Sequence, residues 1–327
     1  MSRLGGRVSL ILLSVLTLAA IATACRPGAP QITPAATPLS VPRTPTAVEK
    51  SARSSFPLTV TGDNGRALTF RTPPKRIVSL SPGHTEILFA IGAGNLMVGA
   101  DTFSDYPPAA QALAKVDYSQ PNLEQLVALA PDLVIAVTRQ KAAAPEMEKL
   151  GLPVLYRVEP DTLDGVVDLV RVFGRLTDHQ DQAEEVAGAM QRRISAIEQR
   201  LEGVAEGPTV FYELSPDLYT VGPHSFIGDL LTRLKVRNIA ARVDAPFPKL
   251  SQEQVIQDDP EVVILGDGSA GETAETVRAR PGWDKLRAVK QGRIVVVVDR
   301  DILHRPGPRV VEGMEFLAHQ LYPERFP

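Results

Sequence analysis

The sequence has 327 residues, a formal net charge of −3 at pH 7 and 44% hydrophobic residues. A slightly acidic chain lacks the basic field that nucleic-acid binding requires, so we expect no nucleic-acid partner. The single cysteine excludes an intrachain disulfide, and the length allows one large domain or two domains of medium size.

The N-terminal segment, residues 1–24, has the pattern of an export signal. Arg3 and Arg7 precede an apolar run, and small residues then lead to Cys25. This pattern resembles a bacterial lipoprotein signal, which implies that Cys25 is lipidated and becomes the mature N-terminus. The alternatives are cleavage after Ala24 without lipidation and a retained anchor helix, although the apolar run is short for a transmembrane span.

Residues 25–55 predict a tether between the export signal and the folded part. Prolines recur there among alanine, threonine and serine, and no apolar periodicity is present. Such a composition favours a semi-extended chain that holds a folded body away from a membrane. We therefore exclude these residues from the fold.

Residues 56–176 predict an N-terminal α/β lobe. Two short apolar segments flank Asp63-Asn64-Gly65, which is typical of a β-hairpin turn. Strands and helices then alternate along the segment, and this alternation predicts a mainly parallel sheet covered by helices. The predicted strands lie at 58–60, 67–70, 75–80, 98–100, 133–137 and 154–156, and helices at 87–91, 123–130, 145–150 and 161–176.

The loop expected at residues 81–86 follows a strand and precedes a helix. Free backbone N–H groups collect at such a position, which makes it a natural place for ligand contacts. His84 lies in this loop. It is a candidate ligand-binding or metal-binding residue, and the alternative is a solvated loop histidine.

Residues 177–203 predict one long helix. Apolar residues recur at steps of three and four, which places a narrow apolar stripe on one face. Thr177 and Gln180 fit a capping box, and Gly203 fits a helix end. A rod of roughly 25 residues spans about 37 Å. It suits a connection between two lobes, and the alternative is an ordinary long surface helix.

Residues 204–327 predict a second α/β lobe that repeats part of the first. Tyr118 and Phe247 each stand six residues before a Glu-Gln-aliphatic sequence, in which Glu124 and Glu253 open a helix. Each unit continues with a proline, an acidic residue and an aliphatic strand, which indicates one structural unit written twice. Chance is the alternative, because the sequence identity between the two units is sparse.

The repeat places equivalent residues on two lobes. If the lobes face each other, the aromatic residues can line a cleft, and both glutamates stand on its rim. Paired exposed acids suit docking to a two-fold partner that carries basic residues. The alternative role of each glutamate is to stabilise the amino end of its own helix.

The loop at 299–309 again follows a strand and precedes a helix. Arg305 in this loop can pair with a carboxylate or phosphate group of a ligand. The alternative is a surface salt bridge between Arg305 and Asp301.

Catalytic motifs are missing from the sequence. It contains no paired catalytic carboxylates, Gly-x-Ser-x-Gly elbow, phosphate loop or Cys/His pair, so we expect no enzyme activity and no cofactor. A receptor for free zinc or manganese would need several histidines and a carboxylate that converge. His84, His224 and His304 are the loop candidates, and we predict no metal site.

Five stretches carry a resemblance to a known family. They are 75–92 (KRIVSLSPGHTEILFAIG), 103–108 (FSDYPP), 122–135 (NLEQLVALAPDLVI), 250–264 and 305–309 (RPGPR). Together they resemble the iron-siderophore, haem and vitamin B12 class of ABC-importer substrate-binding proteins. The resemblance implies the helical-backbone periplasmic-binding-protein fold: α/β, with two lobes of mainly parallel sheets joined by one long rigid helix.

The resemblance also implies a function. Such a protein acts outside the cytoplasm, is held at the membrane face or lies in the periplasm, and delivers its ligand to an ABC permease dimer; we expect a monomer. Within the class, the closest pattern is that of the cobalamin-binding members. A ferric siderophore or haem is the alternative ligand, and free zinc or manganese is less favoured.

The resemblance finally implies roles for single residues. The implied ligand contacts are Phe103, Tyr118, Tyr219, Phe247, Asp301 and Arg305, and the implied permease-docking residues are Glu124 and Glu253. Cobalamin-binding members carry tryptophan at two of the aromatic positions, where this sequence has Tyr118 and Phe247. A smaller or differently shaped ligand is therefore an alternative to cobalamin.

Overall fold

The computed structural model of the protein describes residues 56–327. The predicted export signal, the tether and Cys25 lie outside the described residues. Among the helices of residues 56–327, none combines the length and the apolar character needed to cross a membrane.

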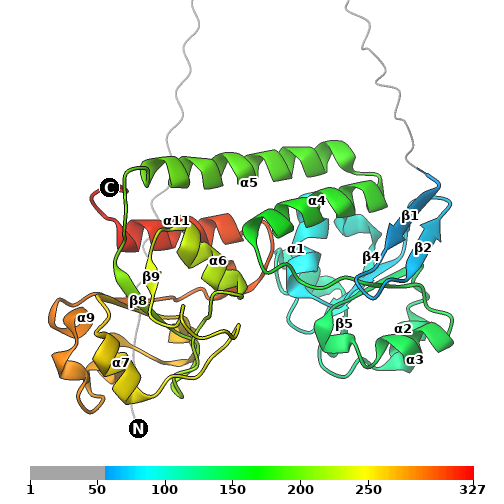
Figure 1. Ribbon diagram of the computed structural model, residues 1–327. Coiled ribbons are helices and arrows are strands. Elements are labelled where there is room, and N and C mark those ends of the chain that lie inside the picture. The colour runs from blue at the N-terminus through cyan, green and yellow to red at the C-terminus, as the bar shows by residue number, and fades with distance from the viewer. Residues whose placement is uncertain (1–55) are drawn as a thin grey trace, which may run out of the picture. The chain divides into compact units, whose positions relative to one another are not determined.

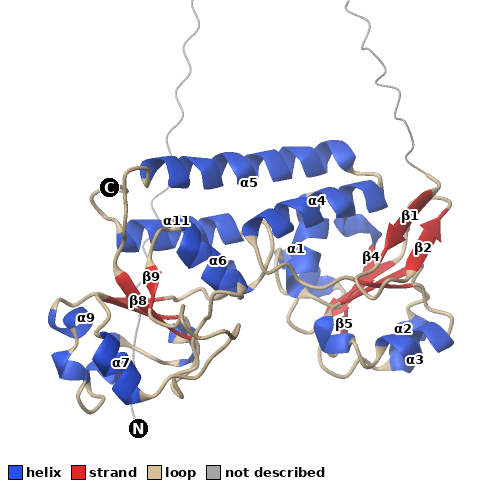
Figure 2. Cartoon of the chain, viewed as in Figure 1, coloured by secondary structure: helices blue, strands red, loops and turns tan. Residues whose placement is uncertain are grey.

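The N-terminal lobe is built on a five-stranded parallel sheet with the strand order β5-β4-β3-β6-β7 (Figures 1 and 2). The predicted hairpin is present beside it as an antiparallel pair, β1 (Leu58–Thr61) and β2 (Ala67–Phe70). The sheet strands are β3 (Ile77–Ser79), β4 (Met97–Asp101), β5 (Ala114–Val116), β6 (Leu133–Ala136) and β7 (Val154–Tyr156). The helices that alternate with them are α1 (Pro82–Ala90), α2 (Leu123–Ala128) and α3 (Ala144–Lys149).

The C-terminal lobe contains a four-stranded parallel sheet with the order β11-β10-β8-β9. Its strands are β8 (Thr209–Glu213), β9 (Arg237–Asn238), β10 (Val262–Leu265) and β11 (Ile294–Val296). Its helices are α6 (Phe226–Arg233), α7 (Gln252–Asp258), α8 (Ala274–Arg278), α9 (Arg287–Lys290), α10 (Asp301–His304) and α11 (Val310–Leu321). One face of this sheet packs on a separate small core that includes the fully buried Trp283.

The long helix predicted for residues 177–203 is present as α5 (Gln180–Arg200), and the helix predicted at 161–176 is present as α4 (Leu163–Thr177). The predicted capping box is wrong, because the Thr177 hydroxyl donates back to the Phe173 carbonyl at 2.8 Å. Asp178 then turns the chain with a φ of 62°, and α5 runs back along α4 and across to α11 (Figure 1).

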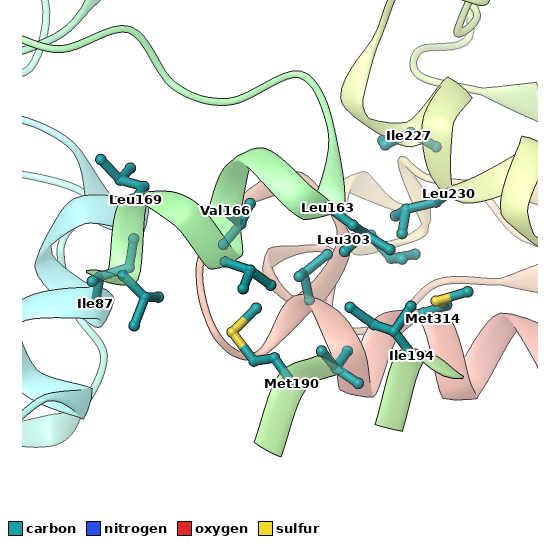
Figure 3. Close-up of a cluster of buried hydrophobic side chains, with 14 of the residues drawn as sticks. Ile87, Leu163, Val166, Leu169, Met190, Ile194, Ile227, Leu230, Leu303 and Met314 are labelled. Carbon is teal, nitrogen blue, oxygen red and sulfur yellow. The ribbon is translucent and has the colours of Figure 1, made fainter. Parts of the chain in front are cut away.

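The apolar stripe predicted on the long helix is buried in the structure. Its residues are Ala183, Ala187, Met190, Ile194, Ile197 and Leu201. Figure 3 shows Met190 and Ile194 of α5 beside residues from both lobes, with Ile87 on one side and Met314 on the other. One hydrophobic core therefore continues from the N-terminal lobe through α4 and α5 into the C-terminal lobe.

The repeated units fold alike. Glu124 and Glu253 lie in the first turns of α2 and α7, and each helix ends next to a non-glycine residue with a φ of 44°. In each unit, the acidic residue that follows the proline accepts backbone hydrogen bonds near the start of a neighbouring strand. Asp132 accepts hydrogen bonds from the backbone of Lys75 and Arg76 before β3, and Glu261 accepts one from the backbone of Thr209 in β8.

Candidate functional site

Exposed aromatic residues follow the carboxyl ends of two neighbouring strands in the N-terminal lobe. Phe103 comes after β4 and is 58% exposed, and Tyr118 comes after β5 and is half-buried. Their rings meet edge to face with centroids 5.5 Å apart. Because both strands are parallel, their ends bring the two rings to the same edge of the sheet. Burial raises the Tyr118 pKa to about 12, so its hydroxyl is neutral at physiological pH.

A second exposed aromatic pair lies on the C-terminal lobe. Tyr219 follows β8, and Phe247 lies in the loop before α7 with 57% of its surface exposed. The segments that carry them are joined, because Tyr219 forms an isolated antiparallel bridge with Lys249. The Lys249 ammonium lies 5.4 Å from the Tyr219 ring centroid. Each lobe therefore carries two of the four predicted aromatic residues at or near its surface.

Two valines are also exposed, and the sequence analysis missed both. Val158 follows β7, and Val298 follows β11 with 79% of its surface exposed. Strand β11 ends at Val296, so Val298 lies outside it. The available signal was the position of each valine two residues after a strand.

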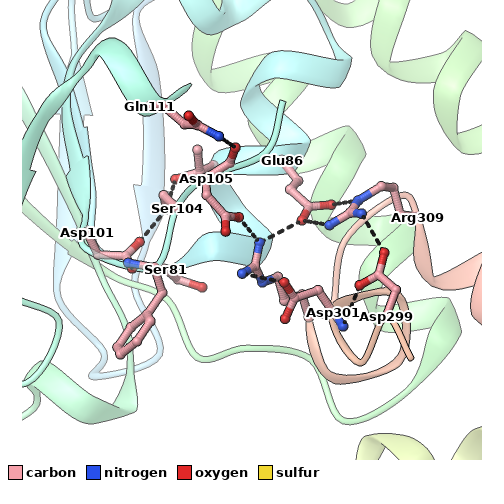
Figure 4. Close-up of polar contacts among 12 residues, drawn as sticks. Ser81, Glu86, Asp101, Ser104, Asp105, Gln111, Asp299, Asp301 and Arg309 are labelled. Atoms are coloured by element: carbon pink, nitrogen blue, oxygen red, sulfur yellow. Dashed lines mark hydrogen bonds and ion pairs between the residues drawn. The ribbon is translucent and has the colours of Figure 1, made fainter. Parts of the chain in front are cut away.

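Arg305 contacts both lobes. Its Nη1 lies 2.6 Å from Oδ1 of Asp105, in the loop after β4, and 3.6 Å from Oε1 of Glu86 in α1. Its Nη2 lies 2.7 Å from Oδ2 of Asp301, so the salt bridge considered as an alternative is present (Figure 4). The Arg305 guanidinium lowers the pKa of Asp105, and this carboxyl is therefore ionised at neutral pH.

Arg309 makes a second connection between the lobes. Its Nε and Nη2 donate to the two carboxylate oxygens of Glu86 at 2.9 and 2.7 Å, while Glu86 is only 3% exposed. Its Nη1 lies 3.6 Å from Asp299, and its guanidinium carbon lies 3.9 Å from the Tyr106 ring centroid. These partners raise the pKa of Arg309.

We call the six charged residues of these two connections the interlobe ion network. They are Glu86, Asp105, Asp299, Asp301, Arg305 and Arg309. Sequence reasoning named only Asp301 and Arg305. The other members lie within or beside the family-like stretches, but their pairing depends on the tertiary fold.

A partly buried carboxyl group in the N-terminal lobe and a buried one in the C-terminal lobe also follow strands. Glu159, after β7, accepts a hydrogen bond of 2.5 Å from Ser81, and burial raises the pKa of this glutamate. Asp267, after β10, is 2% exposed, and neither carboxylate oxygen has a hydrogen-bond partner among the described residues. Burial raises the Asp267 pKa as well.

The prediction that His84 lies in a loop is wrong. Helix α1 begins at Pro82, so His84 is helical, and its ring is fully buried with its centroid 5.2 Å from that of Phe173 in α4. Neither ring nitrogen has a partner among the described residues. Burial lowers the His84 pKa to about 3, which keeps the ring neutral. His84 therefore faces the core and is not among the surface groups available to a ligand.

The loop prediction is also wrong for His304, which is the last residue of helix α10, whereas His224 lies in a turn. His304 contacts the Tyr212 hydroxyl through Nε2 at 2.9 Å and Arg300 through Nδ1 at 3.2 Å, so both ring nitrogens are engaged. His224 is exposed and lies 3.0 Å from Asp244. No group of three or more His, Cys, Asp or Glu side chains within residues 56–327 is arranged to hold a metal ion.

Comparison with known proteins identifies the family. Residues 77–300 match the family model described as periplasmic binding protein. The chain belongs to the periplasmic binding protein family. It is 30% identical over 285 residues to an uncharacterized ABC transporter substrate-binding lipoprotein, YvrC, of Bacillus subtilis, which covers 85% of this chain and 89% of that protein.

Two further relatives of this periplasmic binding protein are described as binding different ligands. The cobalamin-binding protein of Halobacterium salinarum is 31% identical over 277 residues, with 82% of this chain and 75% of that protein covered. The solved structure of a possible iron-binding (periplasmic solute-binding) protein from Staphylococcus epidermidis is 32% identical, with a TM-score of 0.69. The aligned region covers 77% of this chain and 100% of the Staphylococcus chain.

The two glutamates expected at the rim of this periplasmic binding protein are exposed. Glu124 opens α2 on the N-terminal lobe, and Glu253 opens α7 on the C-terminal lobe. Asn122 and Ser251 cap the two helices, so neither glutamate is needed as the N-cap residue. Hydrogen bonds from its own backbone and from Ser251 lower the pKa of Glu253, so this exposed side chain also stabilises the amino end of α7.

Proposed function

We propose that this protein is the extracytoplasmic substrate-binding component of an ABC importer and that it captures a corrinoid of the cobalamin type between its lobes. The observation that carries the proposal is the pair of aromatic residues on each lobe: exposed Phe103 with half-buried Tyr118, and exposed Tyr219 and Phe247. Exposed aromatic side chains at strand ends give a large apolar ligand two surfaces on which to pack.

The choice of a corrinoid rests on similarity and on surface chemistry. The cobalamin-binding relative supports it, and so does the combination of apolar rings with the polar interlobe ion network. Haem or a ferric siderophore is the second candidate, and the likeness to the Staphylococcus protein favours keeping it. Free zinc or manganese is less favoured, since His84 is buried and both ring nitrogens of His304 are engaged.

The permease contact follows from the repeat. Glu124 and Glu253 occupy equivalent exposed positions on the two lobes, and we propose that they dock on basic residues of a two-fold permease dimer. Lipidation of Cys25 and a tether over residues 25–55 remain part of the proposal, which places the protein at the outer face of the cytoplasmic membrane or in the periplasm.

The test is a titration of the purified protein with cyanocobalamin, haemin and ferric siderophores, followed by calorimetry and visible absorbance. We expect saturable one-to-one binding of cyanocobalamin. Phe103→Ala and Phe247→Ala should each weaken binding by roughly tenfold, because each removes a packed aromatic face.

Leu150→Ala is the matched control, because Leu150 is an exposed large apolar residue next to α3 that is not part of either aromatic pair. Its affinity should equal that of the wild type. Saturation by haemin or a siderophore alone would keep the transport role and reject the corrinoid. No binding of any chelate, together with stoichiometric zinc or manganese, would reject the proposal.

A further inference from the structure

The two arginines that reach from the C-terminal lobe toward the N-terminal lobe are already paired with carboxylates. Arg305 is held by Asp105 at 2.6 Å and by Asp301 at 2.7 Å, and it is only 12% exposed. Arg309 donates two hydrogen bonds to Glu86 at 2.9 and 2.7 Å. Neither guanidinium is available to an incoming anion without breaking an existing ion pair.

Carboxylates outnumber guanidiniums in the interlobe ion network. It holds four acidic residues and two arginines, so its net charge is −2 when all six groups are ionised. The side chains that solvent reaches best are acidic, with Asp105 58% and Asp299 56% exposed. A ligand that contacts this network therefore meets carboxylate oxygens rather than cations (Figure 4).

These acids are close in sequence to exposed apolar residues. Asp105 lies two residues after Phe103, and Asp299 directly follows the exposed Val298. Two cations of the C-terminal lobe contact uncharged groups instead: Lys249 lies over the Tyr219 ring, and Arg300, next to Asp299 in the sequence, donates to His304. The net charge of −2 is therefore that of the six network residues alone.

We propose that the interlobe ion network selects ligands by the charge of the edge that faces it. A ligand edge that bears neutral hydrogen-bond donors, such as primary amides, or positive charge is accepted there. A carboxylate at the same edge is disfavoured, because it faces Asp105 and Asp299, while Arg305 and Arg309 are already paired. This inference rests on the proposed function and assigns Asp105 and Asp299 as specificity-determining residues.

The test compares cyanocobalamin with its separated monocarboxylate isomers, in each of which one side-chain amide is hydrolysed to a carboxylate. Each isomer differs from the parent by one charge and almost no volume. At least one isomer should bind about fivefold more weakly to the wild type at low salt, since two charges about 4 Å apart in water interact with that strength. The penalty should shrink as ionic strength rises.

The variants Asp299→Asn and Asp105→Asn should each reduce the penalty for that isomer, measured as the ratio of the cyanocobalamin affinity to the isomer affinity in the same variant, because each removes one of the repelling charges. Asp168→Asn removes the same charge from the exposed face of α4 and should leave the penalty unchanged. This control separates a local effect from a change in net charge.

The outcomes are distinct. Equal affinity of the parent and every isomer would overturn charge selection while leaving corrinoid capture intact. A penalty that Asp168→Asn relieves as much as Asp299→Asn would also overturn it. Failure of cyanocobalamin itself to bind would instead refute the proposed function, and the inference with it.

Discussion

His84 shows how the interior of this protein constrains a single ionisable side chain. The ring is fully buried between α1 and α4, and burial together with the nearby charge of Arg157 lowers its pKa from 6.5 to about 3. The unfolded chain therefore takes up this proton more readily than the folded one. The contribution of His84 to stability is complete above pH 6.5 and is lost as the pH falls toward 3.

A pH titration of stability tests this effect. Between pH 7 and pH 5 the wild type should lose about 2 kcal/mol more of its free energy of unfolding than His84→Leu does, because only the wild type retains the buried imidazole. The measurement is urea unfolding at both pH values. His224→Leu, which removes an exposed histidine, is the control. Equal losses in the wild type and His84→Leu would contradict the assignment.

At the scale of elements, a glycine sets the spacing of the α4–α5 pair. A Cβ at Gly174 would lie 2.3 Å from Cβ of Ala183 and 3.2 Å from the carbonyl oxygen of His179. The missing side chain lets α5 pack directly on α4 just after the turn at Asp178. On α5 itself, a Cβ at Gly188 would meet only the mobile end of the Arg192 side chain, at 3.2 Å.

The two glycines should therefore respond in opposite directions to the same substitution. Gly174→Ala should destabilise the protein by about 1–3 kcal/mol, because the methyl group overpacks the helix contact. Gly188→Ala should stabilise it by about 0.5–1 kcal/mol, because alanine favours the helix and has room there. Thermal unfolding of both variants is the measurement, and stabilisation of both would mean that the helices can separate at little cost.

The same region shows what sequence patterns can and cannot predict. The period of apolar residues predicted the buried stripe on α5, because burial of one helix face produces a regular local spacing. The predicted start of the long helix at Thr177 lies before the true start at Gln180, because Thr177 and Gln180 mimic a capping box, whereas the real turn depends on Asp178. Local propensity does not distinguish a helix end from a helix start at such a point.

Prediction of the site was limited in a similar way. The aromatic and acidic residues follow strand ends, a position that the sequence does indicate. Arg305 pairs with Asp105, which lies 200 residues earlier in the sequence, and only the tertiary fold brings the two side chains together. His84 was misplaced because the segment Ser81-Pro82-Gly83 resembles a loop, although Pro82 in fact opens helix α1.

At the scale of the whole folded part, the continuous core predicts that the two lobes unfold together. Ile194 on α5 is 4% exposed and belongs to the cluster that includes Ile87 of α1 and Met314 of α11. Ile194→Ala should destabilise the protein by about 2–5 kcal/mol, because it opens a cavity in a shared core.

Hydrogen exchange during denaturant titration provides the measurement. Amides of β3 in one sheet and of β10 in the other should lose protection at the same urea concentration in the wild type, and both should shift equally in Ile194→Ala. A shift confined to one sheet would show that the lobes are energetically independent.

The position of Trp283 has a consequence for spectroscopy. This residue is the only tryptophan in the sequence, is fully buried beside Phe211, and lies under the Arg280 guanidinium at 4.6 Å. A ligand cannot quench its emission by contact, so an optical response requires energy transfer to a chromophore. Corrinoids and haem absorb light and would dim this single fixed donor, whereas a colourless ligand would leave it bright. The fold thus contains a built-in optical reporter that distinguishes pigmented from colourless ligands before any label is added.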